Sequence, residues 1–378
     1  MSKNYLMTPG PTPVPEEIRL EMAKPIIHHR TKEYQAIFKE ATEGLKSIFK
    51  TSNDILTFTS SGTGAMEASI VNVLSPGDKI IVVRGGKFGE RFGEIAKAYG
   101  VEAIPIDIEW GQAPRPEVIK ETLKVHPDAR GVYTTLCETS TATVYDIKSI
   151  GNIVKDTDAL FVVDVISGLG ADDFENDGWG VDMAVGGSQK GLMIPPGLAF
   201  LSVSQKAWKV VESSRLPKFY FNLKKYKKAY LDTDTPFTSA ITLVIALKKA
   251  VELINKKGID NVIAEHKRLA LATREAIKAM GLGLFSRSPS YALTGVNAPP
   301  GINADEIIKL LKTEFGVTFA GGQGELKGKI FRIAHMGGID EEHTLESIKA
   351  LEAGLVKLGY KFKAGIGLET AKKALARR

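Results

Sequence analysis

Residues 159–190 decide the fold, because two apolar segments within this stretch each end in polar side chains. The first segment reads Ala-Leu-Phe-Val-Val-Asp-Val-Ile-Ser-Gly over 159–168, and the second reads Val-Asp-Met-Ala-Val-Gly-Gly-Ser-Gln-Lys over 181–190. Apolar runs without alternation indicate strands that are buried on both faces. Because open α/β sheets bind ligands at the carboxyl ends of their strands, Asp164 and Lys190 are predicted to lie at one shared edge.

Strand-like and helix-like segments alternate along the chain from residue 55 onward. Seven strands are expected at 55–59, 78–84, 101–107, 131–137, 159–164, 181–186 and 197–203. Crossover helices are expected near 64–74, 89–99, 115–125 and 146–157. This alternation is typical of the α/β class, with a mainly parallel seven-stranded sheet sandwiched by helices. Further along, an α+β pattern has strands near 291–296, 317–320 and 330–334 and helices at 304–315 and 341–358.

We divide the chain into an N-terminal arm over 1–15, a large ligand-binding domain over 16–257 and a small C-terminal domain over 258–378. The arm contains Thr-Pro-Gly-Pro at 8–11, which cannot form a helix and is expected to be extended. The small domain is expected to begin with one long amphipathic helix over 258–280.

The charge balance raises the question of an acidic partner. The chain has 50 Lys and Arg against 44 Asp and Glu, a net charge of +6. Most of this charge is dispersed among acidic residues, but residues 218–228 read Lys-Phe-Tyr-Phe-Asn-Leu-Lys-Lys-Tyr-Lys-Lys. A basic cluster interleaved with aromatic residues is one form of nucleic-acid patch. No RNA- or DNA-binding motif accompanies it, so no nucleic-acid partner is predicted.

Cysteine, histidine and apolar content exclude several further classes. Cys137 is the sole cysteine, which rules out an intramolecular disulfide and a cysteine-based metal cluster. The adjacent His28 and His29 do not face the same way on regular structure, so no metal site is expected. No apolar run reaches transmembrane length and the N-terminus lacks the features of a signal peptide. We therefore expect a cytoplasmic protein with no membrane partner.

A carboxylate and an amine at one sheet edge can form a plain ion pair, which is the simplest interpretation of Asp164 and Lys190. Pyridoxal phosphate offers another, because it needs a lysine for its Schiff base and an acid beside its pyridinium nitrogen. The Gly-Gly-Ser-Gln-Lys sequence at 186–190 leaves backbone room for such a planar ligand. The whole segment resembles the cofactor-lysine region of the class V, fold-type I aminotransferases, in particular the alanine–glyoxylate and serine–pyruvate group.

The resemblance implies a phosphate site at the turn Thr-Ser-Ser-Gly-Thr-Gly over 59–64. Backbone N–H groups at a helix start form an anion site, and the turn is neither a P-loop nor a dinucleotide fingerprint. In the family, residues matching Ser61, Gly62 and Thr63 bind the cofactor phosphate. An aromatic residue matching Phe88 stacks on the pyridine ring, although Phe88 is alternatively the first core residue of its helix.

Other matching positions are implied to surround the cofactor. The sequence Glu-Thr-Ser-Thr-Ala at 138–142 resembles the Glu-Thr-Ser-Thr-Gly motif, in which the residue matching Thr139 contacts the cofactor near its phenolic oxygen. The resemblance places Ser188 and Gln189 near the phosphate and the ring substituents. Hydroxyl residues matching Thr235 and Thr238 reach the other subunit's phosphate in a homodimer, and an ordinary helix N-cap is the alternative.

Substrate binding is assigned to Arg332 and Gly10. Arg332 lies in an apolar strand, where its guanidinium needs either a structural carboxylate or an anionic ligand. The sequence Phe-Arg-Ile-Ala-His-Met-Gly at 331–337 is similar to the family motif that contains the substrate-carboxylate arginine. The family's arm also passes close to substrate at the residue matching Gly10. His335 is expected to have a supporting role only.

The resemblance implies a homodimeric aminotransferase that acts through a Schiff base on Lys190, with Asp164 on the pyridine nitrogen. A single dedicated substrate cation, Arg332, favours a small neutral donor such as alanine or serine, with glyoxylate or pyruvate as acceptor. The His29-Arg30 pair resembles a substrate-phosphate position of phosphoserine aminotransferases, which are the alternative within the class. The sequence also permits a lyase on the same fold, a dinucleotide-dependent oxidoreductase or a basic binding protein.

Overall fold

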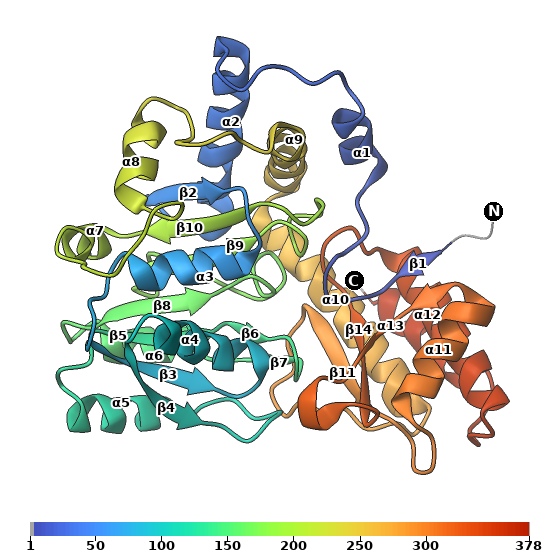
Figure 1. Ribbon diagram of the computed structural model, residues 1–378. Helices are drawn as coiled ribbons and strands as arrows, with labels where there is room; N and C mark the ends of the chain where they lie inside the picture. The colour runs from blue at the N-terminus through green and yellow to red at the C-terminus, as the bar shows by residue number, and fades with distance from the viewer. Residues whose placement is uncertain (1–3, 378) are drawn as a thin grey trace.

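A seven-stranded sheet lies at the centre of the first two thirds of the chain in the computed structural model, which describes residues 4–377 (Figure 1). Its strands, in spatial order, are β2 (Asp54–Phe58), β10 (Ala199–Val203), β9 (Met183–Gly187), β8 (Leu160–Asp164), β5 (Gly131–Thr135), β3 (Lys79–Arg84) and β4 (Glu102–Asp107). β10 runs antiparallel to both of its neighbours, and the other pairs are parallel. The predicted mainly parallel seven-stranded sheet is confirmed.

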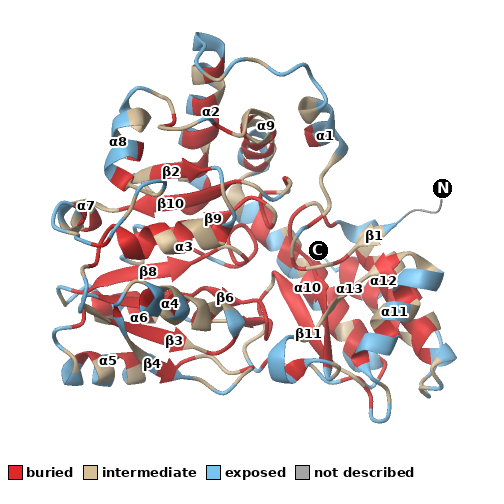
Figure 2. Cartoon of the chain, in the orientation of Figure 1, coloured by how far each residue is buried: buried red, intermediate tan, exposed pale blue. Residues whose placement is uncertain are grey.

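The sheet is buried on both faces, as its apolar runs predict. In β8, Leu160 and Val162 belong to one hydrophobic cluster, while Phe161 and Val163 belong to the cluster on the opposite face. All four side chains are at most 1% exposed. Figure 2 shows the same burial along the central strands. A strand covered on both sides has no polar positions to alternate with apolar ones, which explains its continuous apolar sequence.

Helices cover both faces of this sheet (Figure 1). The predicted crossover helices are α3 (Gly62–Val71), α4 (Lys87–Ala98), α5 (Pro116–Val125) and α6 (Ile147–Val154). Helix α2 (Lys32–Phe49) packs against α9 (Ile241–Lys257), and the short α1 (Glu16–Met22) also contacts α9. Thr31 caps α2, because its hydroxyl accepts a hydrogen bond from the backbone N–H of Tyr34.

The C-terminal part has a separate three-stranded antiparallel sheet and its own hydrophobic cluster. Its strands and helices are α10 (Ile259–Ala279), β11 (Leu293–Asn297), α11 (Ala304–Phe315), β13 (Ala320–Gly321), η1 (Gly324–Leu326), β14 (Ile330–Ala334), α12 (Glu341–Lys357) and α13 (Ile366–Leu375). The N-terminal strand β1 (Tyr5–Leu6) pairs in parallel with β12 (Val317–Thr318). The arm is therefore attached to the C-terminal part of the chain. The boundaries at 15 and 257 stay a prediction.

Some elements differ from the sequence-based expectation. The strand expected over 131–137 ends at Thr135, and β6 (Cys137–Glu138) instead pairs with β7 (Thr143–Val144) in a separate hairpin. The strand expected over 317–320 is two short strands, β12 and β13. Helices α7 (Gln205–Val211) and α8 (Leu223–Leu231) were not predicted; both are short, and most of α8 lies in the basic cluster over 218–228.

The basic cluster over 218–228 contains five lysines, two of which form ion pairs. Lys224 pairs with Glu212, and Lys227 pairs with Asp54. The Lys218 ammonium donates to the backbone oxygens of Val71 and Leu216, at 3.1 Å each. These three lysines therefore have partners within the chain. Within residues 4–377, no helix is both long and apolar enough to cross a bilayer.

We expect Gly151→Ala to destabilise the protein, because a Cβ at this position in α6 would lie 1.9 Å from the backbone oxygen of Trp179. The cost is about 1–3 kcal/mol, which is typical of overpacking. Gly93→Ala in α4 is the matched control, since its Cβ would meet the nearest atom at 3.8 Å and the helix gains up to about 1 kcal/mol. Thermal unfolding of both variants measures the difference. Equal midpoints would contradict the packing that places α6 on the sheet.

Candidate active site

Neighbouring strands bring Asp164 and Lys190 to one edge of the sheet. β8 ends at Asp164, and β9, its parallel neighbour, is followed directly by residues 188–190. Asp164 is 4% exposed and Lys190 is 8% exposed, so both charged groups are buried. The Asp164 carboxylate accepts a hydrogen bond of 2.7 Å from the Ile166 N–H, while the Lys190 ammonium donates to the backbone oxygen of Pro9. Their polar contacts are therefore with the backbone.

Burial shifts the titration of both groups toward neutral pH. Burial raises the pKa of Asp164 to about 7, against the lowering effects of the Ile166 N–H and of Lys190. The pKa of Lys190 is lowered to about 8, chiefly by burial and also by the nearby guanidinium groups of Arg332 and Arg91, whereas Asp164 opposes the shift. An amine that loses its proton near neutral pH suits nucleophilic and acid–base chemistry.

The N-terminal arm packs over Lys190. Gly10, the arm residue that the resemblance assigns to the substrate site, lies against the lysine side chain. The Thr12 hydroxyl donates to the backbone oxygen of Lys190 at 3.0 Å, and the Thr12 N–H donates to that of Gln189 at 3.1 Å. Gly10 has φ +108°, and a Cβ there would lie 2.4 Å from Cδ and Cε of Lys190. Only glycine fits against the lysine side chain in this backbone conformation.

The predicted phosphate turn lies beside the end of β8. Gly62 starts α3, and a Cβ on it would lie 2.3 Å from Cδ1 of Ile166, the residue two positions after Asp164. Ser61 is the N-cap of α3, but its side chain makes no capping hydrogen bond within residues 4–377. The first N–H groups of a helix have no partner within the helix, so those of Gly62 and Thr63 are suited to an anion.

Arg332 lies in β14 with its guanidinium bonded to backbone carbonyls. Nη1 donates to the Thr139 oxygen at 2.7 Å, and Nε and Nη2 donate to the Gly321 oxygen at 2.9 and 2.8 Å. The residue is 5% exposed, and burial lowers its pKa to about 10. Because neutral carbonyls orient the guanidinium without neutralising its charge, it retains the capacity to bind an anion.

The loop after β6 contacts both Arg332 and the segment that directly follows β8. The Thr139 hydroxyl lies 2.5 Å from the Ser167 hydroxyl, and the Thr139 carbonyl binds Arg332. Ala142, which stands where the resembling motif has glycine, has φ +58°. This left-handed conformation explains the motif's glycine, and here alanine adopts it. Sequence analysis missed Ser167, and its position three residues after Asp164 is the only signal for it.

Phe88 lies at the start of α4 and is half-buried, whereas Phe92 of the same helix is 0% exposed. Phe92 therefore fills the core position that was the alternative role for Phe88. The guanidinium carbon of Arg91 lies 4.9 Å from the centre of the Phe88 ring, and Arg91 donates to the Thr63 hydroxyl at 3.2 Å. Sequence analysis missed Arg91, although a residue three positions after Phe88 shares its helix face.

Ser188 and Gln189 have different surroundings. The Ser188 hydroxyl donates to the Pro195 oxygen at 2.7 Å and accepts from the Leu198 N–H at 3.2 Å, so it closes the loop that follows Lys190. The side-chain oxygen of Gln189 is buried, and no residue within 4–377 donates a hydrogen bond to it. A buried acceptor without a donor is suited to a ligand.

The two threonines expected at a subunit interface lie in one loop before α9. The Thr235 hydroxyl donates to the Phe237 oxygen at 2.7 Å, whereas Thr238 is exposed. The Ala240 N–H donates to the Thr59 hydroxyl at 3.2 Å, which brings this loop beside the predicted phosphate turn. The Arg30 side chain pairs with Asp234 in the same loop.

His335 and Cys137 are both buried and uncharged. Burial lowers the pKa of His335 well below its usual value, and its Nε2 lies 2.8 Å from the Thr294 hydroxyl. Burial also raises the pKa of Cys137 well above the usual thiol value, so the thiol stays protonated. Over residues 4–377, no group of three or more His, Cys, Asp or Glu residues has a geometry that would hold a metal ion.

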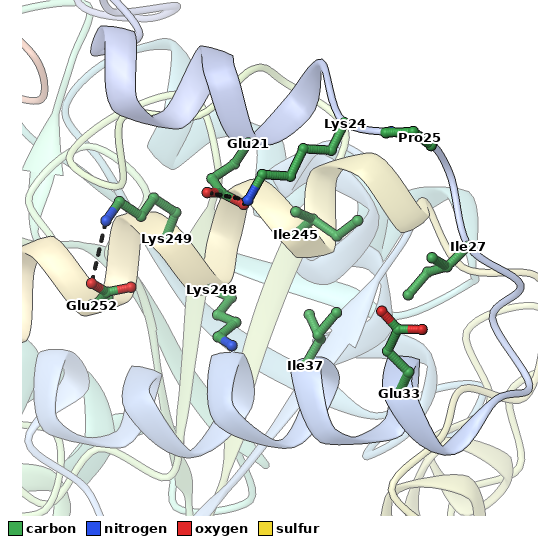
Figure 3. A pocket seen from close by; sticks show the side chains of 10 residues that line it. All are labelled: Glu21, Lys24, Pro25, Ile27, Glu33, Ile37, Ile245, Lys248, Lys249 and Glu252. Carbon is green, nitrogen blue, oxygen red and sulfur yellow. Dashed lines mark hydrogen bonds and ion pairs between the residues drawn. The ribbon is translucent and has the colours of Figure 1, made fainter.

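A surface pocket elsewhere does not belong to this site. It lies between α1, α2 and α9, and Figure 3 shows Ile37 and Ile245 beside charged residues that include the ion pair Glu21–Lys24, 2.7 Å. None of the site residues that the sequence predicted lines this pocket. Acidic and basic side chains both line this pocket, as is usual where helix faces are exposed to solvent.

Lys190 of the ligand-free protein is expected to react with formaldehyde and borohydride with a half-maximal extent near pH 8, because its pKa is about 8. Asp164→Asn should move this midpoint to lower pH, since it removes a negative charge that favours the ammonium form. Peptide mass spectrometry follows the labelling, with the exposed Lys349 as internal control. A Lys190 midpoint equal to that of Lys349 would contradict the described environment.

Comparison with known proteins agrees with the geometry. Residues 5–327 match the family model of the class-V aminotransferases. The chain is 44% identical to a Synechococcus protein named soluble hydrogenase, small subunit, with 99% of each chain covered. It is 35% identical to an L-aspartate–glyoxylate aminotransferase of Paracoccus denitrificans, with 98% of this chain and 96% of that one covered.

A solved structure shows the same fold over nearly the full length. The ureidoglycine–glyoxylate aminotransferase of Bacillus subtilis superposes with a TM-score of 0.94 at 30% identity, and the match covers 99% of this chain and 98% of that one. The predicted α/β fold and the predicted aminotransferase activity are therefore confirmed. This chain belongs to the class-V aminotransferase family.

Proposed function

We propose that this aminotransferase moves an amino group from alanine or serine to glyoxylate or pyruvate, with pyridoxal 5′-phosphate bound at Lys190. One observation carries the proposal: a buried amine, a buried carboxylate and a buried guanidinium share one site, and their hydrogen bonds go to the backbone. The guanidinium of Arg332 and the carboxylate of Asp164 are both close enough to Lys190 to shift its pKa.

The residues present fit pyridoxal phosphate. The N-terminus of α3 offers the N–H groups of Gly62 and Thr63 to a phosphate, with Ser61 and Thr63 as further hydroxyl donors. The Asp164 carboxylate is suited to a protonated ring nitrogen, and the half-buried Phe88 is suited to stacking. Thr139, Ser188 and Gln189 complete the proposed set, and the unpartnered Gln189 oxygen is an observation in its favour.

Pyridoxal phosphate, when bound, supplies an aldehyde that condenses with amines and a ring that withdraws electrons. The Lys190 amine would bind the cofactor and would take up and return the proton at Cα of the amino acid, which requires the neutral amine that a pKa of about 8 makes accessible. Asp164 holds a proton on the ring nitrogen. A cation next to its carboxylate would lower the pKa of Asp164 below the value of about 7 that it has in the ligand-free protein, which favours the ionised acid.

Arg332 is proposed to bind the substrate carboxylate. The Thr139 and Gly321 carbonyls fix the plane of its guanidinium. The Arg332 side chain therefore loses less conformational entropy when substrate binds. The arm residue Gly10 lies against Lys190 and leaves space that any side chain would fill. In this proposal, the Arg332 guanidinium and the space beside Gly10 together hold a small amino acid next to the Lys190 amine.

The acceptor is supported by the relatives, since both aminotransferases named above are named for glyoxylate. Their donors differ, so the donor is argued from the site, in which Arg332 is the proposed substrate cation. The phosphoserine alternative needs Arg30, but that guanidinium is already paired with Asp234 and bonded to the Thr235 oxygen at 2.9 Å. The site therefore favours a neutral donor over a phosphorylated one.

The proposal includes a cytoplasmic homodimer with active sites at the subunit interface. The exposed Thr238 lies in the loop that contacts the phosphate turn, and Phe219, whose ring centre is 5.9 Å from that of Phe237 in this loop, is 71% exposed. An exposed phenylalanine beside a functional loop suits a contact with a second subunit. Thr235 and Thr238 are the proposed contributions to the partner's phosphate site. The substrates are small molecules, and no nucleic acid or membrane is involved.

Wild-type protein with pyridoxal phosphate is expected to show the visible absorption band of the lysine-bound cofactor. Alanine or serine should convert this band to that of the amine form, whereas phosphoserine, glutamate and aspartate should not. Lys190→Ala should lack the band and lose at least roughly 100-fold in turnover, since the acid–base group is removed. Conversion by phosphoserine or aspartate would replace the proposed donor, and release of product without amino transfer would indicate the lyase.

Arg332→Ala should raise KM for both substrates roughly 10- to 100-fold, because charge-assisted hydrogen bonds to the carboxylate are lost. Cofactor affinity should stay within about twofold of wild type, since Arg332 is not proposed to touch the cofactor. Arg332→Lys keeps a charge without the bidentate geometry and should be intermediate. Arg30→Ala is the control that should leave KM for alanine unchanged. An Arg332→Ala protein with normal KM values would remove Arg332 from the substrate site.

A further inference from the structure

Glu138 is a fully buried carboxylate that the proposed mechanism does not use. It lies in β6, directly before Thr139, and is 0% exposed. Within the described part of the chain, its oxygens pair with no lysine or arginine but accept hydrogen bonds from the start of α4 and from Ser140. A buried charge with such partners requires a reason, because an apolar residue would avoid the desolvation cost.

Four donors surround the Glu138 carboxylate. Oε2 accepts from the N–H groups of Phe88 at 3.1 Å and Gly89 at 2.8 Å, and Oε1 accepts from the N–H of Ser140 at 3.1 Å and its hydroxyl at 2.5 Å. The Ser140 hydroxyl itself accepts from the Lys87 N–H at 3.0 Å, so its proton is directed to Glu138. Burial raises the pKa of Glu138, and all four donors oppose that shift. Only an ionised carboxylate satisfies all of them.

The same contacts fix the first turn of α4. Helix α4 has 12 residues and begins at Lys87, and its N-cap Gly86 has no side chain to cap it. Glu138 and Ser140 supply the missing acceptors from another part of the chain, and a carboxylate is also the charge that a helix N-terminus favours. A Cβ on Gly86 would lie 2.6 Å from Cγ and Cδ of Glu138 and 2.3 Å from the Ser140 hydroxyl oxygen. The carboxylate therefore packs directly on the backbone that precedes Phe88.

We propose that Glu138 is a positioning residue for Phe88: by bonding the backbone N–H of Phe88 itself, it sets where the aromatic ring lies over the cofactor. The inference rests on the proposed function, because it requires a planar cofactor beside Phe88. Glu138 is followed directly by Thr139, whose hydroxyl contacts Ser167 and whose carbonyl accepts a hydrogen bond from Arg332. One short segment would therefore orient three groups of the proposed site: the Phe88 ring, the Thr139 hydroxyl and the Arg332 guanidinium.

A purely electrostatic role for Glu138 is the competing explanation. The Glu138 charge lies near enough to raise the pKa of Asp164 and that of Arg332, although burial dominates both shifts. An effect of this kind would act on the cofactor whether or not the Phe88 ring is present. A positioning effect would vanish without the ring. A double-mutant cycle distinguishes the two roles.

The test measures the dissociation constant of pyridoxal phosphate for wild type, Glu138→Gln, Phe88→Ala and the double variant, by visible absorbance of the bound cofactor. Glu138→Gln should weaken cofactor binding at least 10-fold, because the NH₂ group of the new side chain would face N–H or O–H donors from which the carboxylate oxygen accepts. In the Phe88→Ala background, the same substitution should change affinity less than threefold. Visible circular dichroism of the bound cofactor should change in Glu138→Gln as it does in Phe88→Ala. Glu90→Gln, on the same helix and paired with Lys87, should match wild type.

An equal loss of affinity in both backgrounds, or no loss in Glu138→Gln, would overturn the inference. If Glu138→Gln does not fold, Ser140→Ala replaces it, since this change removes one donor to the carboxylate and the acceptor of the Lys87 N–H. It should weaken binding severalfold in the wild-type background and not in Phe88→Ala. A wild-type protein that binds no pyridoxal phosphate would instead refute the proposed function.

Discussion

The burial of an amine and a carboxylate at the same sheet edge, with hydrogen bonds to the backbone, is the constraint on which the active site depends. Two charges removed from water normally pair with each other, and a close pair would keep Lys190 protonated and unreactive. Here the Pro9 carbonyl binds the amine and the Ile166 N–H binds the acid. The two charges thus lie close enough to shift each other's pKa, while the hydrogen bonds of each go to the backbone.

The fold supplies this arrangement through its strand order. β8 and β9 are parallel neighbours in the middle of the sheet, so their carboxyl ends are held by strands on both sides and by two hydrophobic clusters. The third charge, Arg332, lies in the separate C-terminal sheet, and its guanidinium donates a hydrogen bond to the Thr139 carbonyl of the N-terminal part. A site assembled from two sheets can change shape when the sheets move relative to each other.

The sequence was sufficient for the mainly parallel seven-stranded sheet and for the placing of Asp164 and Lys190 at one sheet edge, because continuous apolar strands that end in polar residues leave a strong pattern. The substrate role of Gly10 stays a prediction, although the residue lies against the Lys190 side chain. The sequence was insufficient for Ser167 and Arg91, since a single hydroxyl or a single guanidinium leaves no periodic signal of its own in the sequence. Long-range contacts such as the Arg30 pair with Asp234, 204 residues apart, depend on tertiary packing that no local pattern encodes.

The N-terminal arm contacts both parts of the molecule. Strand β1 adds to β12 in the C-terminal part, Met7 is fully buried, and the following residues reach Lys190. The beginning of the chain therefore bridges the two parts of the molecule that supply Arg332 and Lys190. A movement of one part relative to the other would have to be accommodated by this arm, because the arm is attached to both of them.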